Sequence, residues 1–312
     1  MKSKPVVGRF APSPSGRMHL GNVYAALLSW LSARAAGGKW IVRIEDLDAQ
    51  RCRREYASKI LDDLCYLGLE WDGDVVFQSE RTDFYKAAFD RLFEKGLLYP
   101  CFCSRADLRA SSAPHSSDGV SVYAGTCRAL SKNSIVELTK NRLPCWRIRV
   151  FGESSFEDAH YGFQKIALES ESGDFVIRRA DGNFSYQLAV TVDDAAQGVT
   201  EVVRGRDLLL SAHRQIFLYR ALNETPPTFS HAPLLVSNDG RRLSKRERDF
   251  DMEKLRIHFS KEEIIGKILF LCGFLEKEKA VSLSKAVDLF DWKKLPKTDI
   301  PITALGDFDQ AR

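Results

Sequence analysis

The sequence has no long hydrophobic run. None of its apolar stretches approaches the roughly 18 residues that a membrane-spanning helix needs. Residues Met1 to Pro5 carry positive charge, but no apolar signal-peptide core follows them. Internal repeats and low-complexity segments are absent as well. We therefore expect a cytoplasmic globular protein with no membrane partner.

Cysteine is also scarce, with seven residues in a chain of 312. An odd count in a chain of this length without a secretion signal argues against a disulfide framework. The net charge is only +4, which permits a nucleic-acid partner without arguing strongly for one. Hydrophobic residues at 44% and charged residues at 28% are ordinary for a globular protein, and the length allows one large or two modest domains.

The stretch from Val6 to Asn22 predicts an anion site. A short apolar strand to Phe10 meets a turn stiffened by two prolines, and a helix with regularly spaced apolar residues opens near Gly21. Unpaired N–H groups and the dipole of a helix start favour a phosphate, and Gly21 lets it approach the backbone. His19 is placed to donate to a phosphoryl oxygen. The same residues also fit an ordinary loop with a surface histidine.

A second strand is expected from Lys39 to Glu45, so strand, helix and strand form a unit with a parallel sheet. Ligands bind at the carboxyl ends of such strands, and this rim should gather Arg9, Ser13, Glu45 and Asp46. Arg9 can hold a carboxylate in a bidentate fork and Glu45 an ammonium group, which together suggest an amino-acid site. An ordinary rim salt bridge is the alternative.

Cys101 and Cys103, with Cys127 beyond a loop, suggest a zinc knuckle, although Cys-x-Cys is tighter than the usual spacing. Three thiolates need a fourth ligand, and the residues offer His115, Tyr123 or Cys145. Reduced cysteines that pack as small hydrophobic residues are the alternative. We expect the remaining cysteines to be core or surface residues.

The rest of the chain alternates strand and helix patterns. The segment from Phe184 to Asp194 reads as a buried strand that ends in two carboxylates, and Arg204 follows another strand. Further strands are expected at 144–150, 175–178, 200–203 and 231–236, and helices at 55–67, 82–95, 207–222, 261–275 and 284–290.

A second distinctive stretch runs from Asn238 to Arg248, a turn followed by a dense basic loop with a serine inside it. His19-Leu-Gly-Asn22 and Arg242-Leu-Ser-Lys-Arg246 resemble the HIGH and KMSKS signatures of class I aminoacyl-tRNA synthetases. The extended Gly8-to-Gly16 segment resembles that of the glutamyl branch. The similarity covers most of the chain, from about Val6 to Lys245.

The resemblance implies roles for individual residues. ATP would be held, with Mg²⁺, at the first and second signatures, and L-glutamate between strand ends. Asn22 replaces the second histidine of the first signature, so the resemblance does not say how much Asn22 contributes to the reaction rate. The implied catalytic and ATP-binding residues are His19, Gly21, Asn22, Ser244 and Lys245; the implied glutamate-binding residues are Arg9, Phe10, Ala11, Pro12, Ser13, Glu45, Tyr186 and Arg204.

The cysteine pattern is similar to the zinc site of glutamyl-queuosine tRNA(Asp) synthetases, which implies one structural zinc per chain held by Cys101, Cys103, Tyr123 and Cys127. The fold implied is α/β, a doubly wound parallel, Rossmann-type sheet. Its halves would span 1–98 and 146–250, with a zinc-bearing insertion at 99–145 and a helical C-terminal region at 251–312.

Glutamyl-tRNA synthetases continue into a helical anticodon-binding region, whereas this sequence ends at Arg312. We therefore expect tRNA-independent activation of glutamate and its transfer to queuosine, the modified wobble base of tRNA(Asp). Two alternatives are a truncated glutamyl-tRNA synthetase that charges a 3′ end and an inactive paralogue that binds RNA.

Overall fold

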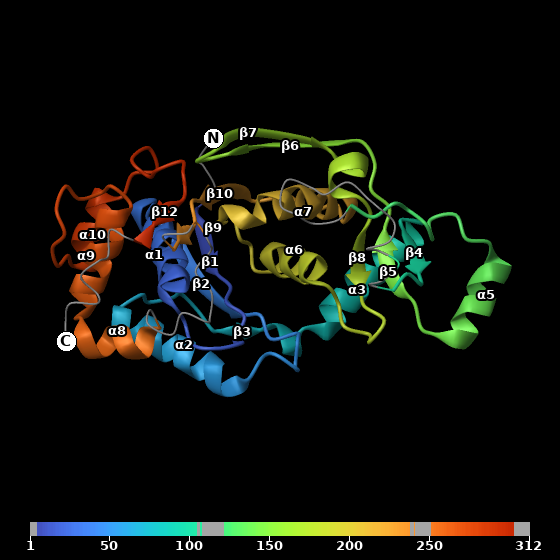
Figure 1. Ribbon diagram of the computed structural model, residues 1–312, viewed down its shortest axis with the longest axis horizontal. Coiled ribbons are helices and arrows are strands. Elements are labelled where there is room, and N and C mark those ends of the chain that lie inside the picture. Colours follow the sequence, from blue (N-terminus) through green and yellow to red (C-terminus); the bar gives the residue numbers. More distant parts are fainter. Residues whose placement is uncertain (1–4, 105–106, 108–121, 238–239, 241–250, 303–312) are drawn as a thin grey trace.

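The computed structural model describes residues 5–104, 107, 122–237, 240 and 251–302 (Figure 1). The strands are β1 (Val7–Phe10), β2 (Lys39–Ile44), β3 (Val76–Phe77), β4 (Leu98–Cys101), β5 (Cys145–Ile148), β6 (Glu153–Asp158), β7 (Gly162–Ala167), β8 (Phe175–Arg178), β9 (Glu201–Gly205), β10 (Thr228–Ala232), β11 (Leu235–Val236) and β12 (Ile300–Pro301). The helices are α1 (Leu20–Ala35), α2 (Arg54–Leu67), α3 (Thr82–Glu94), α5 (Lys132–Asn141), α6 (Tyr186–Ala196), α7 (Leu209–Ala221), α8 (Met252–His258), α9 (Lys261–Leu271) and α10 (Leu283–Leu289), with short helical turns η1 (Gln78–Glu80), η2 (Leu168–Ser172) and η3 (Arg206–Leu208).

Parallel strands form the centre of the fold. In the first sheet, of order β1-β2-β3, β1 pairs with β2 in parallel register from Val7 opposite Lys39 to Phe10 opposite Val42. In the second, of order β7-β6-β10-β9, β9, β10 and β6 are parallel and β7 is an antiparallel edge strand. The Thr200 N–H donates to the Val7 carbonyl at 3.0 Å, so β9 lies beside β1. The carboxyl ends of β1 and β9 therefore open at the same edge, where ligands bind in such folds.

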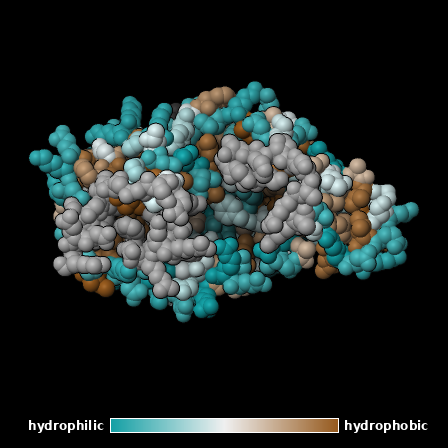
Figure 2. All heavy atoms as spheres, in the orientation of Figure 1, coloured by the Kyte–Doolittle hydropathy of each residue, from teal (hydrophilic) through white to brown (hydrophobic). Residues whose placement is uncertain are grey.

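An antiparallel sheet of order β4-β5-β8 lies toward the end of the molecule that carries α5 (Figure 1). It packs with α3, α6 and α7 through buried residues such as Phe89, Ile148 and Leu188. Figure 2 shows hydrophobic side chains gathered at the α5 end, where Val136 and Leu143 are more than half exposed at 58% and 69%.

Helix α1 lies in the largest buried cluster. Its apolar residues, including Leu27 and Leu31, pack in one core with Ile264 and Ile268 of α9, and the C-terminal helices α9 and α10 contact α2 and α1. Strand β12 pairs with β11, Leu235 opposite Ile300, which fixes this C-terminal part next to β10. Within the described residues, no helix combines the length and apolar composition that a membrane span requires.

The predicted strand from Phe184 to Asp194 is wrong, because this segment forms helix α6. Ser185 caps the helix, its hydroxyl accepting from the Leu188 N–H at 3.4 Å. The run Val190-Thr-Val192 suits a strand by intrinsic propensity, but burial of Leu188 and Ala189 against α3 and α7 selects the helix. The other predicted strands and helices are confirmed in place and type, with two differences: β10 ends before Pro233 and β11 is separate from it, and the helix predicted at 261–275 ends at Leu271.

Candidate active site

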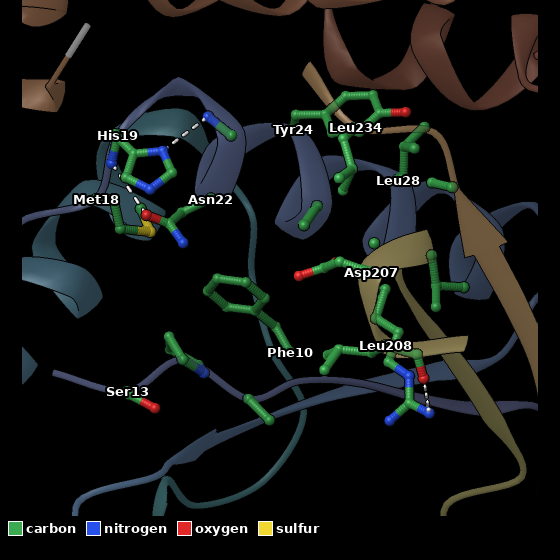
Figure 3. Close-up of a pocket in the computed structure, with 18 of the residues that line it drawn as sticks. Phe10, Ser13, Met18, His19, Asn22, Tyr24, Leu28, Asp207, Leu208 and Leu234 are labelled. Atoms are coloured by element: carbon green, nitrogen blue, oxygen red, sulfur yellow. Dashed lines mark hydrogen bonds between the residues drawn. The ribbon is translucent and has the colours of Figure 1, made fainter. Parts of the chain in front are cut away.

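A cavity of about 510 Å³ opens at the carboxyl ends of β1 and β9. Figure 3 shows His19 and Asn22 on one side of it, Asp207 and Leu208 on the other, and the Phe10 ring between them. Every predicted ATP- or glutamate-binding residue that the structure describes lines this cavity: Arg9, Phe10, Ala11, Pro12, Ser13, His19, Gly21, Asn22, Glu45, Tyr186 and Arg204. Ser244 and Lys245 lie outside the described residues. Their roles stay predictions, but the placement of the others brings both halves of the predicted site together.

The start of α1 differs from the prediction in one respect. The Gly21 N–H is not left for a ligand, because it donates to Nδ1 of His19 at 3.1 Å. The Asn22 side chain accepts from the His19 N–H at 3.1 Å, completing a capping box (Figure 3). A Cβ on Gly21 would lie 3.0 Å from the His19 ring, so the glycine makes room for the imidazole. Since Nδ1 accepts, the proton of the neutral ring is on Nε2.

Arg9 and Glu45 lie at the floor of the cavity. Arg9 is 4% exposed; it donates to the Val203 carbonyl at 3.2 Å, and its Nε lies 3.6 Å from the Asp194 carboxylate. Burial raises the pKa of Glu45 to about 7, although the guanidinium groups of Arg43 and Arg9 favour its charged form. The guanidinium and the carboxyl group are both buried and thus offer opposite charges at the base of the cavity.

A buried ion network supports this floor, and sequence reasoning did not predict it. Arg43 is fully buried; it donates to Asp194 at 2.7 Å and to Glu45 at 3.3 Å. Asp193 accepts from Arg81 at 2.5 Å, and from Tyr85 and Gln78. Asp193 and Asp194 were predicted at the end of a strand. They lie on α6 instead, where their carboxylates face Arg43 of β2. A buried charge is tolerated only when it is paired in this way.

Tyr186 and Arg204 close the other wall of the cavity. Tyr186 begins α6, is 37% exposed and also lines a second, adjacent cavity. Arg204 is 5% exposed and donates to Gln215 at 2.9 Å and to the Leu208 carbonyl at 3.2 Å. Asp46, predicted on the same rim, lies elsewhere: its carboxylate accepts from the backbone and hydroxyl of Ser79 at 2.8 and 2.7 Å. The backbone turns after Glu45, which separates the two neighbouring carboxylates.

Helix α8 attaches to the first signature. His19 and Asp251 form an isolated antiparallel bridge, and the Met252 N–H donates to the Met18 carbonyl at 2.9 Å. Arg17 adds an ion pair with Glu253 at 3.0 Å. The segment that begins at Asp251, shortly after the basic loop around Lys245 (the lysine loop), therefore lies against the start of α1.

The cysteine cluster assembles as the motif predicted. The sulfur atoms of Cys101, Cys103 and Cys127 lie within 4.8 Å of one another and could hold a metal ion. The Tyr123 hydroxyl lies 3.5 Å from the Cys101 sulfur and 3.6 Å from that of Cys103. Cys145, left open as a ligand from the residues alone, instead directs its thiol to the Cys101 carbonyl at 3.4 Å. His115 lies outside the described residues.

Comparisons with known proteins agree with this geometry. The model of the class I tRNA synthetases (E and Q), catalytic domain, matches residues 5–295. A glutamyl-Q tRNA(Asp) synthetase of Symbiobacterium thermophilum is 44% identical over 95% of this chain and 96% of its own length. That of Geobacter sulfurreducens is 49% identical over 78% of this chain and 76% of its own.

Among solved structures, a glutamate tRNA ligase from Elizabethkingia meningosepticum in complex with its amino acid superposes with a TM-score of 0.82. It is 25% identical, and the match covers 98% of this chain and 69% of that one. The family match over most of the chain, and the identity to curated relatives over nearly their full length, confirm the resemblance seen in the two signatures. The chain belongs to the class I tRNA synthetases, among the glutamyl-Q tRNA(Asp) synthetases.

Proposed function

We propose that this chain activates glutamate with ATP and transfers it to queuosine at the wobble position of tRNA(Asp). The observation that carries the proposal is the single cavity in which Arg9, Arg204 and Glu45 lie opposite the His19 helix start. Two cations and one carboxyl group match the charges of glutamate, and the dipole of the helix start together with the Nε2–H of His19 matches a phosphate. Relatives of nearly the same length bear the name of this activity. We expect the enzyme to act in the cytoplasm, where ATP and tRNA are found.

Activation needs little covalent work from the protein. A carboxylate oxygen of glutamate attacks the α-phosphorus of ATP, and pyrophosphate leaves with its bond electrons. Arg9 and Arg204 hold carboxylate groups, and ionised Glu45 holds the ammonium group. His19, through its Nε2–H, stabilises charge on the α-phosphate, and Lys245 neutralises the departing pyrophosphate. Mg²⁺ accompanies ATP.

The remaining predicted residues shape the site around the reacting groups. Asn22 stands where the signature has its second histidine, but it does not act as a cationic donor. Its role is to hold His19 in the capping box. We propose that Gly21 serves the same end by leaving room for the ring. The segment from Phe10 to Ser13 forms the wall between the two substrates, Tyr186 borders glutamate, and Ser244 precedes the lysine in its loop.

The acceptor can reach glutamate through the second cavity. It has a volume of about 490 Å³ and shares Ser13, Glu45 and Tyr186 with the first. The exposed side chains of Arg51 and Arg179 also line it, as suits RNA phosphates. In the transfer step, a hydroxyl oxygen of the acceptor attacks the carbonyl of glutamyl-adenylate. Its proton passes to solvent, AMP leaves with the electrons of the broken carbon–oxygen bond, and an ester remains.

We propose that the cysteine cluster binds one structural zinc through Cys101, Cys103 and Cys127, with Tyr123 as fourth ligand. The donor set fits, because three sulfurs and a phenolic oxygen converge and no other described histidine, cysteine, aspartate or glutamate joins the group. Such a closed site supplies folding stability rather than catalysis.

Labelled glutamate tests the proposal. The purified enzyme should exchange pyrophosphate into ATP with glutamate alone, since the site is built from this chain. Label should then transfer to tRNA(Asp) that carries queuosine, and not to tRNA(Asp) without it or to tRNA(Glu). Nuclease digestion maps the label. Label on the terminal adenosine of tRNA(Glu) would favour a truncated glutamyl-tRNA synthetase, and no exchange at all would favour an inactive RNA-binding paralogue.

A further inference from the structure

Three buried polar residues from neighbouring strands form a line that ends at Arg204. Asp158 closes β6, His231 lies in β10 and Arg204 in β9. His231 and Arg204 are opposite each other in the parallel register of β9 and β10, and β6 is the next strand beyond β10. Their side chains are 1%, 0% and 5% exposed. Only Arg204 of the three lines the cavity.

The hydrogen bonds along this line fix the position of each proton. Nδ1 of His231 lies 2.6 Å from Oδ2 of Asp158, and Arg204 donates from Nε to Nε2 of His231 at 3.1 Å. The arginine has only donors, so Nε2 must accept, and Nδ1 then carries the proton and donates to Asp158. The imidazole is neutral, because burial lowers the pKa of His231 to about 4.

Asp158 is itself held in place. Its Oδ1 accepts from the backbone N–H groups of His160 and Tyr161 at 3.0 and 2.9 Å, and Oδ2 accepts from that of His231 at 3.1 Å. Although burial opposes ionisation, these bonds and the one from the imidazole keep the pKa of Asp158 below its ordinary value. The carboxylate is therefore a fixed acceptor that selects one tautomer of His231.

Arg204 receives its orientation from three sides. Besides Nε, it donates from Nη1 to Gln215 and from Nη2 to the Leu208 carbonyl. Tyr186 interacts with the guanidinium as well, through a side-chain hydrogen bond. Of the five N–H donors of a guanidinium, these four partners leave one on the terminal nitrogens. The bond with His231 sets the plane in which the terminal nitrogens meet a ligand in the cavity.

We propose that Asp158 and His231 are positioning residues for glutamate: they hold the guanidinium of Arg204 in the plane that binds a carboxylate of the amino acid. The proposal rests on glutamate being the amino acid of the cavity. It concerns residues that touch neither substrate, so it goes beyond the assignment of Arg204 as a contact.

The isosteric change Asp158→Asn tests it. The amide oxygen can keep the backbone bonds at Oδ1, but its NH₂ group then faces Nδ1 of His231. The imidazole must accept there and carry its proton on Nε2, which opposes the Nε–H of Arg204. We expect the KM for glutamate in pyrophosphate exchange to rise about 10- to 100-fold, as loss of a hydrogen bond to a charged group implies. The KM for ATP and kcat should change less than threefold.

A second pair of variants separates positioning from folding. His231→Gln offers an amide oxygen toward Arg204 without needing Asp158, whereas His231→Leu offers no acceptor. Gln should retain a glutamate KM within a few-fold of the wild type, and Leu should raise it as Asp158→Asn does. His213→Gln is the matched control, because His213 is equally buried at 2% but bonds to Ser154, at 3.0 Å, and does not line the cavity.

The outcomes are distinct. An unchanged glutamate KM in folded Asp158→Asn, or equal rises in the KM for glutamate and ATP, would show that the line is merely structural. The same glutamate KM in the Gln and Leu variants would refute the role of the acceptor. Wild-type enzyme that exchanges pyrophosphate with another amino acid instead of glutamate would overturn the proposed function rather than the positioning. Circular dichroism and melting temperature establish that each variant is folded.

Discussion

The raised pKa of Glu45 sets a pH range in which glutamate binding should change. Only the ionised carboxylate attracts the ammonium group of the substrate, which stays protonated throughout this range. With a pKa of about 7, about one in eleven Glu45 side chains is ionised at pH 6 and about ten in eleven at pH 8. The KM for glutamate should therefore fall about tenfold from pH 6 to pH 8.

The assay is pyrophosphate exchange with glutamate titrated at saturating ATP, at half-unit steps from pH 5.5 to 8.5. His231 and His213 do not interfere, because burial lowers the pKa of both to about 4.

Glu45→Gln is the control, because it keeps the shape of the side chain and removes the titration. Its glutamate KM should be high and nearly constant over the same range. A wild-type KM that does not change between pH 6 and 8 would refute the assignment of Glu45 to the ammonium group. So would a pH dependence that persists in Glu45→Gln.

The remaining predictions concern stability, the lysine loop and the metal. In the folded protein Glu45 keeps its proton up to a pKa of about 7, whereas the unfolded chain releases it above the ordinary pKa of about 4.5. The contribution of this group to the free energy of unfolding should therefore fall, by on the order of 3 kcal/mol, as pH rises from 4.5 to 7. Chemical denaturation of the wild type and of Glu45→Gln measures this change. Lys245→Ala should lower pyrophosphate exchange by roughly 10²–10³, and an unchanged rate would remove Lys245 from the mechanism. Elemental analysis should find one zinc per chain, lost in Cys103→Ser and weakened in Tyr123→Phe; zinc retained in Cys103→Ser would contradict the site. Asp193→Leu leaves Arg43 and Arg81 without their shared partner and should cost about 3–5 kcal/mol by denaturant titration; a loss below 1 kcal/mol would show that the network is not coupled to folding.

What the sequence predicted well depends on residues close together in the chain. Strand β1, the turn and α1 follow one another, so the position of His19 beside Gly21 is a local matter. Arg9 and Glu45 could be brought together because a strand–helix–strand unit has a single favoured hand and a shared sheet edge. The cysteine cluster is set by spacing in the same way.

What the sequence did not predict depends on pairs far apart in the chain. Arg43 meets Asp194, and Asp158 meets His231, only after several strands have been ordered in the sheet. No local pattern marks such partners. The error at α6 has the same cause: Val190 and its β-branched neighbours suit either state, and the decision comes from the tertiary contacts of Leu188. The capping role of Asn22 was not predictable either, since the known signal is Ser or Thr followed three positions later by Glu or Gln, and here His19 and Asn22 take those places.

The bridge between His19 and Asp251 has a consequence for how the protein folds. The side of the cavity that we propose binds phosphate joins the start of α1 to the segment after the lysine loop, so it is complete only when the chain has been made as far as Asp251. Closing so long a loop is entropically costly, and contacts of this kind form late. A chain that emerges from the ribosome can build β1, α1 and β2 without them, but it lacks this contact between His19 and Asp251. Tight binding of an ATP analogue should accordingly report a late step of folding, and not the formation of the first strand–helix–strand unit.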